Sequence, residues 1–114
     1  MEASTLARRA VELADSRQAS DIVLLDIRPV STIADYFVIC SAETERQIRA
    51  VVEAIDDGIK QDAGIDARIE GKSDTGWVIL DYNDVVIHIF SEEQREFYRL
   101  ERLWAKAPPV VVLQ

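Results

Sequence analysis

The sequence predicts one α/β domain in which a mixed sheet of five strands is flanked by helices. The chain has 114 residues, a length typical of a single domain. Segments with apolar residues at helical spacing alternate with short apolar runs typical of strands. The expected order is one helix, two strands, a helix, three strands and a last helix, without repeats or linkers. We assign residues 1–107 to the domain and residues 108–114 to a C-terminal tail.

The first third of the chain contains a short helix followed by two strands. Apolar residues recur at helical spacing between residues 5 and 16, and Ser4 or Thr5 is a suitable N-terminal cap. Residues 22–27 and 36–40 are nearly unbroken apolar runs, which is typical of strands covered on both faces. Both strands are therefore expected to be buried.

A long amphipathic helix follows the second strand. Glu43 and Glu45 open it, where negative charge interacts favourably with the helix dipole, and Gly64 is a natural stop. Its apolar stripe consists of Ile48, Val51, Val52, Ile55 and Ile59.

The remaining strands include a predicted hairpin. Residues 65–70 form a third strand, and residues 77–82 and 85–90 are joined by Asn83-Asp84 as a two-residue turn. This turn places one wholly apolar face of the hairpin in the core. The opposite face carries Trp77, Ile79 and Asp81 beside Phe90, His88 and Val86. Such a mixed face is either covered by a helix or offered to a partner.

A last helix follows the hairpin. Ser91 caps it, with Gln94 three residues later as in a capping box. Its apolar stripe consists of Phe97, Leu100, Leu103 and Trp104. Pro108-Pro109 prevents any continuation of the helix and leaves the last residues as a tail.

The charge balance indicates which classes of partner the protein is suited to bind. There are 13 Lys and Arg residues against 21 Asp and Glu, which gives a formal net charge of −8. Binding to DNA or RNA through phosphate neutralisation is therefore disfavoured, and a basic protein surface is the better partner. Cys40 is the only cysteine, which fits a reducing compartment. No segment resembles a membrane span or a signal peptide, so a cytoplasmic location is expected.

The candidate catalytic and metal-binding residues have simpler structural explanations. His88, the only histidine, lies beside Asp81 but without a nearby nucleophile, so catalysis is disfavoured. Asp35, Asp81 and Asp84 could in principle hold a hard cation, but a turn and a loop end explain them better. Cys40 in a buried strand is expected to be inert. We expect no catalytic residue, no metal and no cofactor.

Four ordered blocks carry a resemblance to a known family. They are residues 34–40 (ADYFVIC), Glu70-Gly71, residues 77–90 (WVILDYNDVVIHIF) and residues 95–104 in the pattern RxFYxLExLW. Together they resemble the Iojap family, the ribosomal silencing factors. The chain departs from the family pattern in two loops, with Asn83 in place of Gly and residues 42–44 in place of Gly-x-Ser.

This resemblance implies a function without catalysis. It implies binding to the large ribosomal subunit through its universal protein number fourteen, a basic protein, and steric exclusion of the small subunit when nutrients are scarce. The partner-binding residues implied by the family and by the hairpin face are Trp77, Asp81, His88, Phe90, Arg95 and Tyr98. Aromatic residues and arginine are the types that most often anchor interfaces.

The resemblance also implies a nucleotidyltransferase-like fold without the catalytic site. Such enzymes need a Gly-Ser turn and an Asp-x-Asp pair, whereas this chain has residues 41–43 (SAE) and Asp66-x-Arg68. A nucleotide-binding enzyme is therefore disfavoured, because a fold shared without its site implies no activity. Two other hypotheses stay open. One is a role in large-subunit assembly through the same contact, and the other is a homodimer of the free protein through its exposed apolar face.

Overall fold

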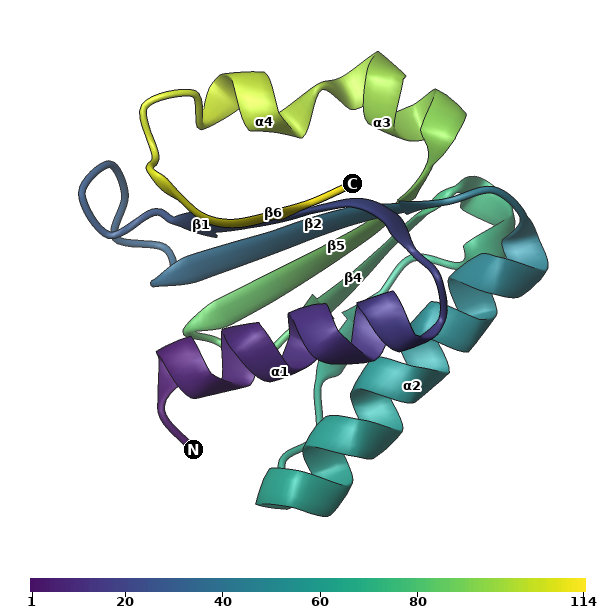
Figure 1. Ribbon diagram of the computed structural model, residues 1–114, viewed down its shortest axis with the longest axis horizontal. Helices are drawn as coiled ribbons and strands as arrows, with labels where there is room; N and C mark the ends of the chain where they lie inside the picture. Colours follow the sequence, from purple (N-terminus) through teal and green to yellow (C-terminus); the bar gives the residue numbers. More distant parts are fainter.

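The computed structural model describes residues 1–114 and contains a mixed sheet with helices on both faces (Figure 1). Its elements are α1 (Ala3–Ser16), β1 (Ser20–Asp26), β2 (Tyr36–Ala42), α2 (Glu45–Ala63), β3 (Arg68–Glu70), a 3₁₀ turn η1 (Ser73–Thr75), β4 (Trp77–Asp81), β5 (Val85–Ser91), α3 (Glu92–Tyr98), α4 (Leu100–Leu103) and β6 (Pro109–Leu113). The strand order is β3-β4-β5-β2-β1-β6, in which β2 and β5 are parallel and all other neighbours are antiparallel. The predicted α/β class is confirmed.

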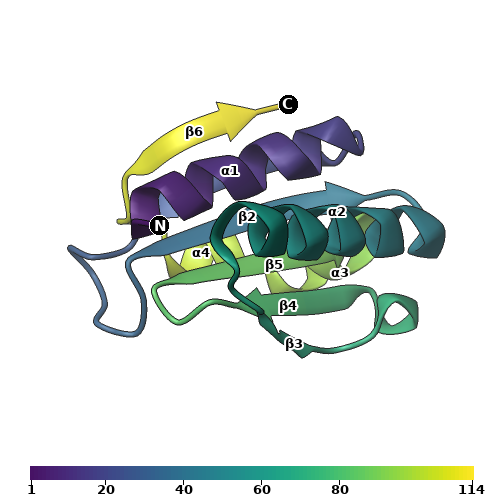
Figure 2. The same ribbon diagram turned by 90° about the horizontal axis from the view of Figure 1, so that it is seen from below.

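The larger core lies between the sheet and the helices α1 and α2. These two helices lie side by side on one face of the sheet (Figure 2). The buried cluster on this side has 22 residues, against 8 on the other side, so this face holds most of the buried apolar surface. The long helix ends as predicted at Gly64, which has φ +68°. It begins at Glu45 and leaves Glu43 outside, because Thr44 Oγ1 caps it by accepting a hydrogen bond from the Gln47 backbone N–H at 3.0 Å.

Helix α1 begins two residues earlier than predicted. It starts at Ala3, and Glu2 occupies the N-cap position without a side-chain hydrogen bond, so the expected cap at Ser4 or Thr5 is wrong. Its buried residues are Leu6, Ala7, Ala10, Val11 and Ala14. Burial of the apolar face therefore stabilises this helix, and no capping side chain contributes.

The hairpin formed by β4 and β5 has the predicted register. Trp77 lies opposite Phe90, Ile79 opposite His88 and Asp81 opposite Val86. Asn83 supplies the positive φ of 70° that the turn needs. Val78, Leu80, Ile87 and Ile89 are all buried on the α2 side, so the predicted core face is confirmed.

The sheet has six strands, one more than predicted. Residues 109–113, expected to be a tail, form the edge strand β6, which pairs antiparallel with β1. A run of β-branched valines favours a strand, and Pro109 is tolerated at its first position because no ladder hydrogen bond is needed there. At the other edge, β3 contains only residues 68–70 of the predicted 65–70.

The last helix is interrupted where the sequence predicts continuity. Ser91 Oγ caps α3 as predicted and accepts from the Gln94 backbone N–H at 3.1 Å. Arg99 then adopts a left-handed conformation with φ +48°, which separates α3 from α4. This break lets Leu100 pack in the smaller core while Phe97 and Leu103 remain exposed, so the predicted apolar stripe is only partly buried.

Candidate partner-binding surface

The sheet face opposite α1 and α2 is only partly covered. The segment α3–α4 lies over it (Figure 1) and packs against a cluster that includes Phe37, Phe90 and Leu100. Trp77 and Val86 pack at the margin of this cluster and stay partly exposed. The hairpin pattern predicts that this mixed face is either covered by a helix or offered to a partner. In the structure α3–α4 cover one part of it, and another part is open to solvent.

Three aromatic side chains form an exposed patch where β4 meets α3. Trp77 stacks on the fully buried Phe90, with ring centroids 4.9 Å apart. Tyr98 lies 4.5 Å from Trp77 between centroids, and Phe97 meets the edge of Tyr98 at 5.0 Å. Tyr98 is 45% exposed and Phe97 is 76% exposed. We call Trp77, Phe97 and Tyr98 the aromatic patch.

Phe97 was not among the predicted site residues. It was assigned to the apolar stripe of the last helix, which the break at Arg99 turns away from the sheet. The sequence carries no local signal for this exposure, because adjacent helical residues point about 100° apart and can share one apolar stripe. Both Phe97 and Tyr98 are exposed in the structure.

Acidic residues border the aromatic patch. Glu93 and Glu96 share a shallow open hollow with Phe97 and Tyr98. Glu96 pairs with Arg99 at 2.7 Å, and its side chain is nevertheless mostly exposed. Glu93 makes no ion pair in the structure. An apolar centre with an acidic rim is complementary to a basic protein surface that carries its own apolar groups.

His88 is buried behind the aromatic patch and is 6% exposed. Its Nδ1 accepts a hydrogen bond from Trp77 Nε1 at 3.2 Å, and the edge of its ring meets Phe37 at 4.9 Å. Its Nε2 is buried and has no partner. Burial lowers the pKa of His88 to about 4, against a smaller opposite effect of the Asp81 carboxylate. The imidazole is therefore neutral near pH 7, which does not suit it to form an ion pair with a partner.

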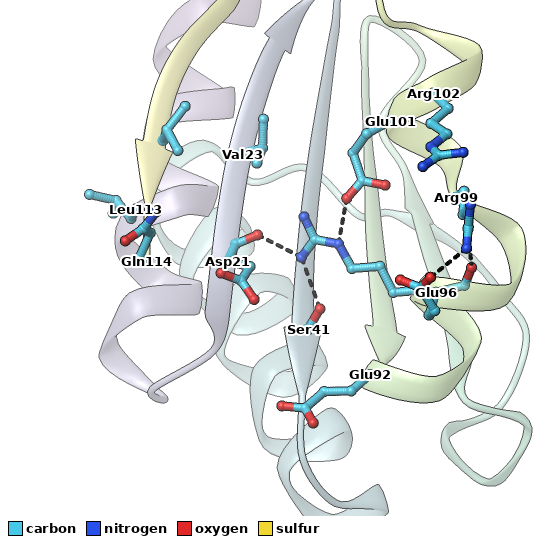
Figure 3. A pocket seen from close by; sticks show the side chains of 12 residues that line it. Asp21, Val23, Ser41, Glu92, Glu96, Arg99, Glu101, Arg102, Leu113 and Gln114 are labelled. Carbon is cyan, nitrogen blue, oxygen red and sulfur yellow. Dashed lines mark hydrogen bonds and ion pairs between the residues drawn. The ribbon is translucent and has the colours of Figure 1, made fainter.

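Arg95 ties the C-terminal helices to the sheet. Its guanidinium donates to the backbone carbonyl of Asp21 at 2.6 Å and to Ser41 Oγ at 2.8 Å, and it forms an ion pair with Glu101 (Figure 3). Its side chain is only 13% exposed. Arg95 was predicted to contact the partner, and the structure instead gives it internal partners on β1, β2 and α4.

The cleft around Arg95 is open and has mixed charge. It has a volume of about 700 Å³ and lies between α3–α4 and the strands β1 and β6. Arg99 and Arg102 also line it, and Arg99 is neutralised by Glu96 (Figure 3). The basic groups are thus interspersed with carboxylates, an arrangement that does not concentrate positive charge for a phosphate.

Asp81 holds the end of the hairpin. Its Oδ1 accepts from the Asn83 backbone N–H at 2.8 Å, and its Oδ2 pairs with Arg68 at 2.9 Å. Of the six predicted site residues, Tyr98 is therefore exposed, and Trp77 and Asp81 are partly exposed. Phe90 has no exposed surface, so its predicted direct contact is wrong for this conformation: it supports Trp77 from below.

The structure offers no grouping suited to metal chemistry. It contains no cluster of three or more His, Cys, Asp or Glu side chains that could hold a metal ion. Burial raises the pKa of the Cys40 thiol to about 12, so this thiol is unreactive at neutral pH.

Comparison with known proteins decides the family. The family described as "Ribosomal silencing factor during starvation" matches residues 1–114. The chain belongs to this family. The resemblance to the ribosomal silencing factors is thus confirmed over the whole chain.

Individual members of the family and their relatives support this assignment. The chain is 37% identical over 111 residues to "Ribosomal silencing factor RsfS" of Halalkalibacterium halodurans, a match that covers 96% of this chain and 94% of that protein. A crystal structure of a Chromobacterium violaceum protein superposes with a TM-score of 0.87 at 27% identity and covers 92% of this chain and 88% of that one. The chain is also 34% identical over 100 residues to "Mitochondrial assembly of ribosomal large subunit protein 1" of Mus musculus, which covers 82% of this chain and 42% of that protein.

The names of these ribosomal silencing factor relatives describe a regulatory factor and an assembly protein, not an enzyme. No helix in the structure has both the length and the apolar character needed to cross a membrane.

Proposed function

We propose that the protein represses translation by binding the large ribosomal subunit and preventing the small subunit from joining it. The proposed contact is the universal ribosomal protein number fourteen, which is basic, and the proposed location is the cytoplasm with the ribosomes. The observation that carries the proposal is the exposed aromatic patch with its acidic rim on a family member with a net charge of −8.

The composition of the patch suits an interface. Trp77 and Tyr98 present large, nearly rigid rings, which cost little conformational entropy when a partner covers them. Phe90 holds Trp77 in place from below, so its orientation is fixed before binding. The acidic rim attracts a basic ribosomal protein, and the net negative charge disfavours attachment to ribosomal RNA elsewhere.

Steric exclusion of the small subunit requires a folded domain that binds the large subunit, but it requires no catalysis. The folded chain has principal extents of 34, 33 and 24 Å, so a bound copy on the intersubunit face occupies space that the small subunit needs. Exclusion requires that the protein occupy this surface often enough, at its concentration and affinity, to compete with the small subunit. In this mechanism the protein acts as a competitor for one surface, and its effect therefore depends on its concentration.

Sedimentation with separated ribosomal subunits tests the proposal. The full chain should migrate with the large subunit alone and should reduce the rejoining of subunits after magnesium is raised. Trp77→Ala and Tyr98→Ala should lose both effects while retaining the fold. Asp57→Asn, which removes one exposed charge on α2 on the opposite face of the sheet, is the matched control and should behave like the parent chain.

A role in large-subunit assembly is the second candidate, favoured by the similarity to the mouse protein named for that process. In this role the protein uses the same contact with the large subunit, but the contact serves assembly of that subunit and does not block subunit joining. If the chain migrates with large subunits but leaves subunit rejoining unchanged, assembly is favoured over silencing. If it does not migrate with large subunits at all, both functions are excluded.

A further inference from the structure

A second surface feature lies next to the aromatic patch. An open groove of about 570 Å³ runs over the half of the sheet face that α3–α4 leaves uncovered, near the β3 edge. Ile33, Phe37, Ile79 and Val86 provide its apolar lining; Ile33 is exposed, and Ile79 and Val86 are partly buried. We call it the hairpin groove, because β4, β5 and their turn supply most of its residues.

The charges of the hairpin groove are mainly negative. Glu70, Asp81 and Asp84 line it against a single cation, Arg68. That cation is already engaged by Asp81 at 2.9 Å and by Glu70 at 3.7 Å. The exposed carboxylate of Asp84 has no hydrogen bond or ion pair within the chain. The groove therefore has an unmatched negative charge at the hairpin turn.

His88 lines the same groove from beneath, and its buried Nε2 is an unsatisfied donor. The indole of Trp77 can only donate, so the His88 Nδ1 that accepts from it carries no proton. The neutral imidazole then has its proton on Nε2, and this buried N–H has no acceptor. A buried donor without a partner is unusual in a folded protein and gains if a ligand supplies an oxygen.

We propose that the hairpin groove binds an extended basic segment of a partner protein. A lysine or arginine of the segment pairs with Asp84 at the turn, its apolar neighbours cover Ile79 and Val86, and a backbone carbonyl accepts from His88 Nε2–H after a small shift of the side chains above the ring. This inference rests on the proposed function and extends it, since it adds a polar, sequence-selective contact beside the aromatic patch. Nucleic acid is not a suitable occupant, because its phosphates would meet three carboxylates.

A peptide titration of the full chain tests the groove directly. The probe is an end-blocked peptide, Lys-Val-Lys-Val-Lys, and the matched control peptide has Glu in place of each Lys. Nuclear magnetic resonance should show saturable shifts at the amides of Ile79 and Val86 and slowed exchange of the His88 Nε2 proton with the lysine peptide only. Asp84→Asn should weaken binding of the lysine peptide at least about threefold, whereas Asp57→Asn should leave this binding unchanged.

Three results would overturn the inference: no shifts in the groove at millimolar lysine peptide, equal shifts with the glutamate peptide, or no effect of Asp84→Asn. Sedimentation with large subunits separates this inference from the proposed function. If Trp77→Ala loses binding and Asp84→Asn keeps it fully, the function stands and the groove contributes nothing to it. If the parent chain does not bind subunits, the proposed function fails, and the peptide titration alone decides whether the groove takes a basic segment.

Discussion

The indole Nε1 of Trp77 donates a hydrogen bond to Nδ1 of His88 at 3.2 Å, which joins a partly exposed aromatic residue to a buried imidazole. The two residues lie on neighbouring strands, and the hairpin register brings them to the same sheet face. The bond fixes the orientation of the indole and the tautomer of the imidazole together. The orientation of Trp77 in the candidate interface therefore depends on the buried imidazole beneath it.

Stability should fall in mild acid because of His88. Its pKa is about 4 when folded and 6.5 in the reference state, so between these values the unfolded chain binds a proton that the folded chain does not. The stability that the folded state has with neutral His88 is fully present above pH 6.5 and is lost as the pH falls towards 4. We expect a loss of about 2 kcal/mol in unfolding free energy between pH 7.5 and pH 5.0, measured by urea denaturation. His88→Gln, which keeps an acceptor for Trp77, should lack this part of the pH dependence; an identical slope would refute the assignment.

Phe97 should matter for binding and not for folding. Its side chain is 76% exposed, so Phe97→Ala should change the unfolding free energy by less than about 0.5 kcal/mol. It should weaken binding to large subunits by about tenfold if the aromatic patch is the anchor. Leu103→Ala is the matched control, because Leu103 is 74% exposed on the same segment but outside the patch. Equal effects of the two variants on sedimentation would show that the patch has no special role.

Arg95 should hold α3–α4 on the sheet. Arg95→Ala removes two hydrogen bonds to β1 and β2 and leaves the Glu101 carboxylate without its partner. We expect a loss of about 2–4 kcal/mol in unfolding free energy, together with faster amide exchange in residues 92–107. Arg99→Ala removes an exposed pair with Glu96 and should cost less than about 0.5 kcal/mol. Similar costs for the two variants would contradict the anchoring role.

Gly71 should be needed for the position of Trp77. Gly71 has φ +85°, and a Cβ atom there would lie 2.3 Å from the backbone carbonyl oxygen of Trp77. Gly71→Ala should therefore cost at least about 2 kcal/mol and shift the Trp77 fluorescence maximum. Gly64→Ala, at φ +68° with open space around it, isolates the backbone cost and should lose only about 1 kcal/mol without a spectral change. An unchanged Trp77 environment in Gly71→Ala would argue against this coupling.

The last strand should protect the edge of the sheet. Removal of residues 108–114 exposes the backbone edge of β1, which is largely apolar, and removes the contact of Val111 with the main core. We expect a loss of about 2 kcal/mol or more in stability and concentration-dependent association, seen by thermal unfolding and light scattering. A truncated chain as stable and as monodisperse as the parent would show that β6 is dispensable.

Local pattern accounts for much of the fold. The hairpin register follows from a two-residue turn, and the end of α2 and its buried face follow from Gly64 and a regular apolar stripe. These features depend on residues close in sequence, so the sequence was sufficient to predict them. The family assignment also came from ordered residue blocks, and Trp77 and Tyr98 were correctly expected to lie together.

The sequence by itself thus determined the α/β class, the hairpin register and the aromatic residues near the candidate interface. Only the tertiary structure decided that Arg99 breaks the last helix, that Phe97 faces outward and that Phe90 and His88 lie beneath Trp77. It also decided that residues 109–113 pair with β1. The physical reason is that these outcomes depend on contacts between segments far apart in the chain, such as Arg95 with Asp21 and Ser41, which local periodicity does not encode.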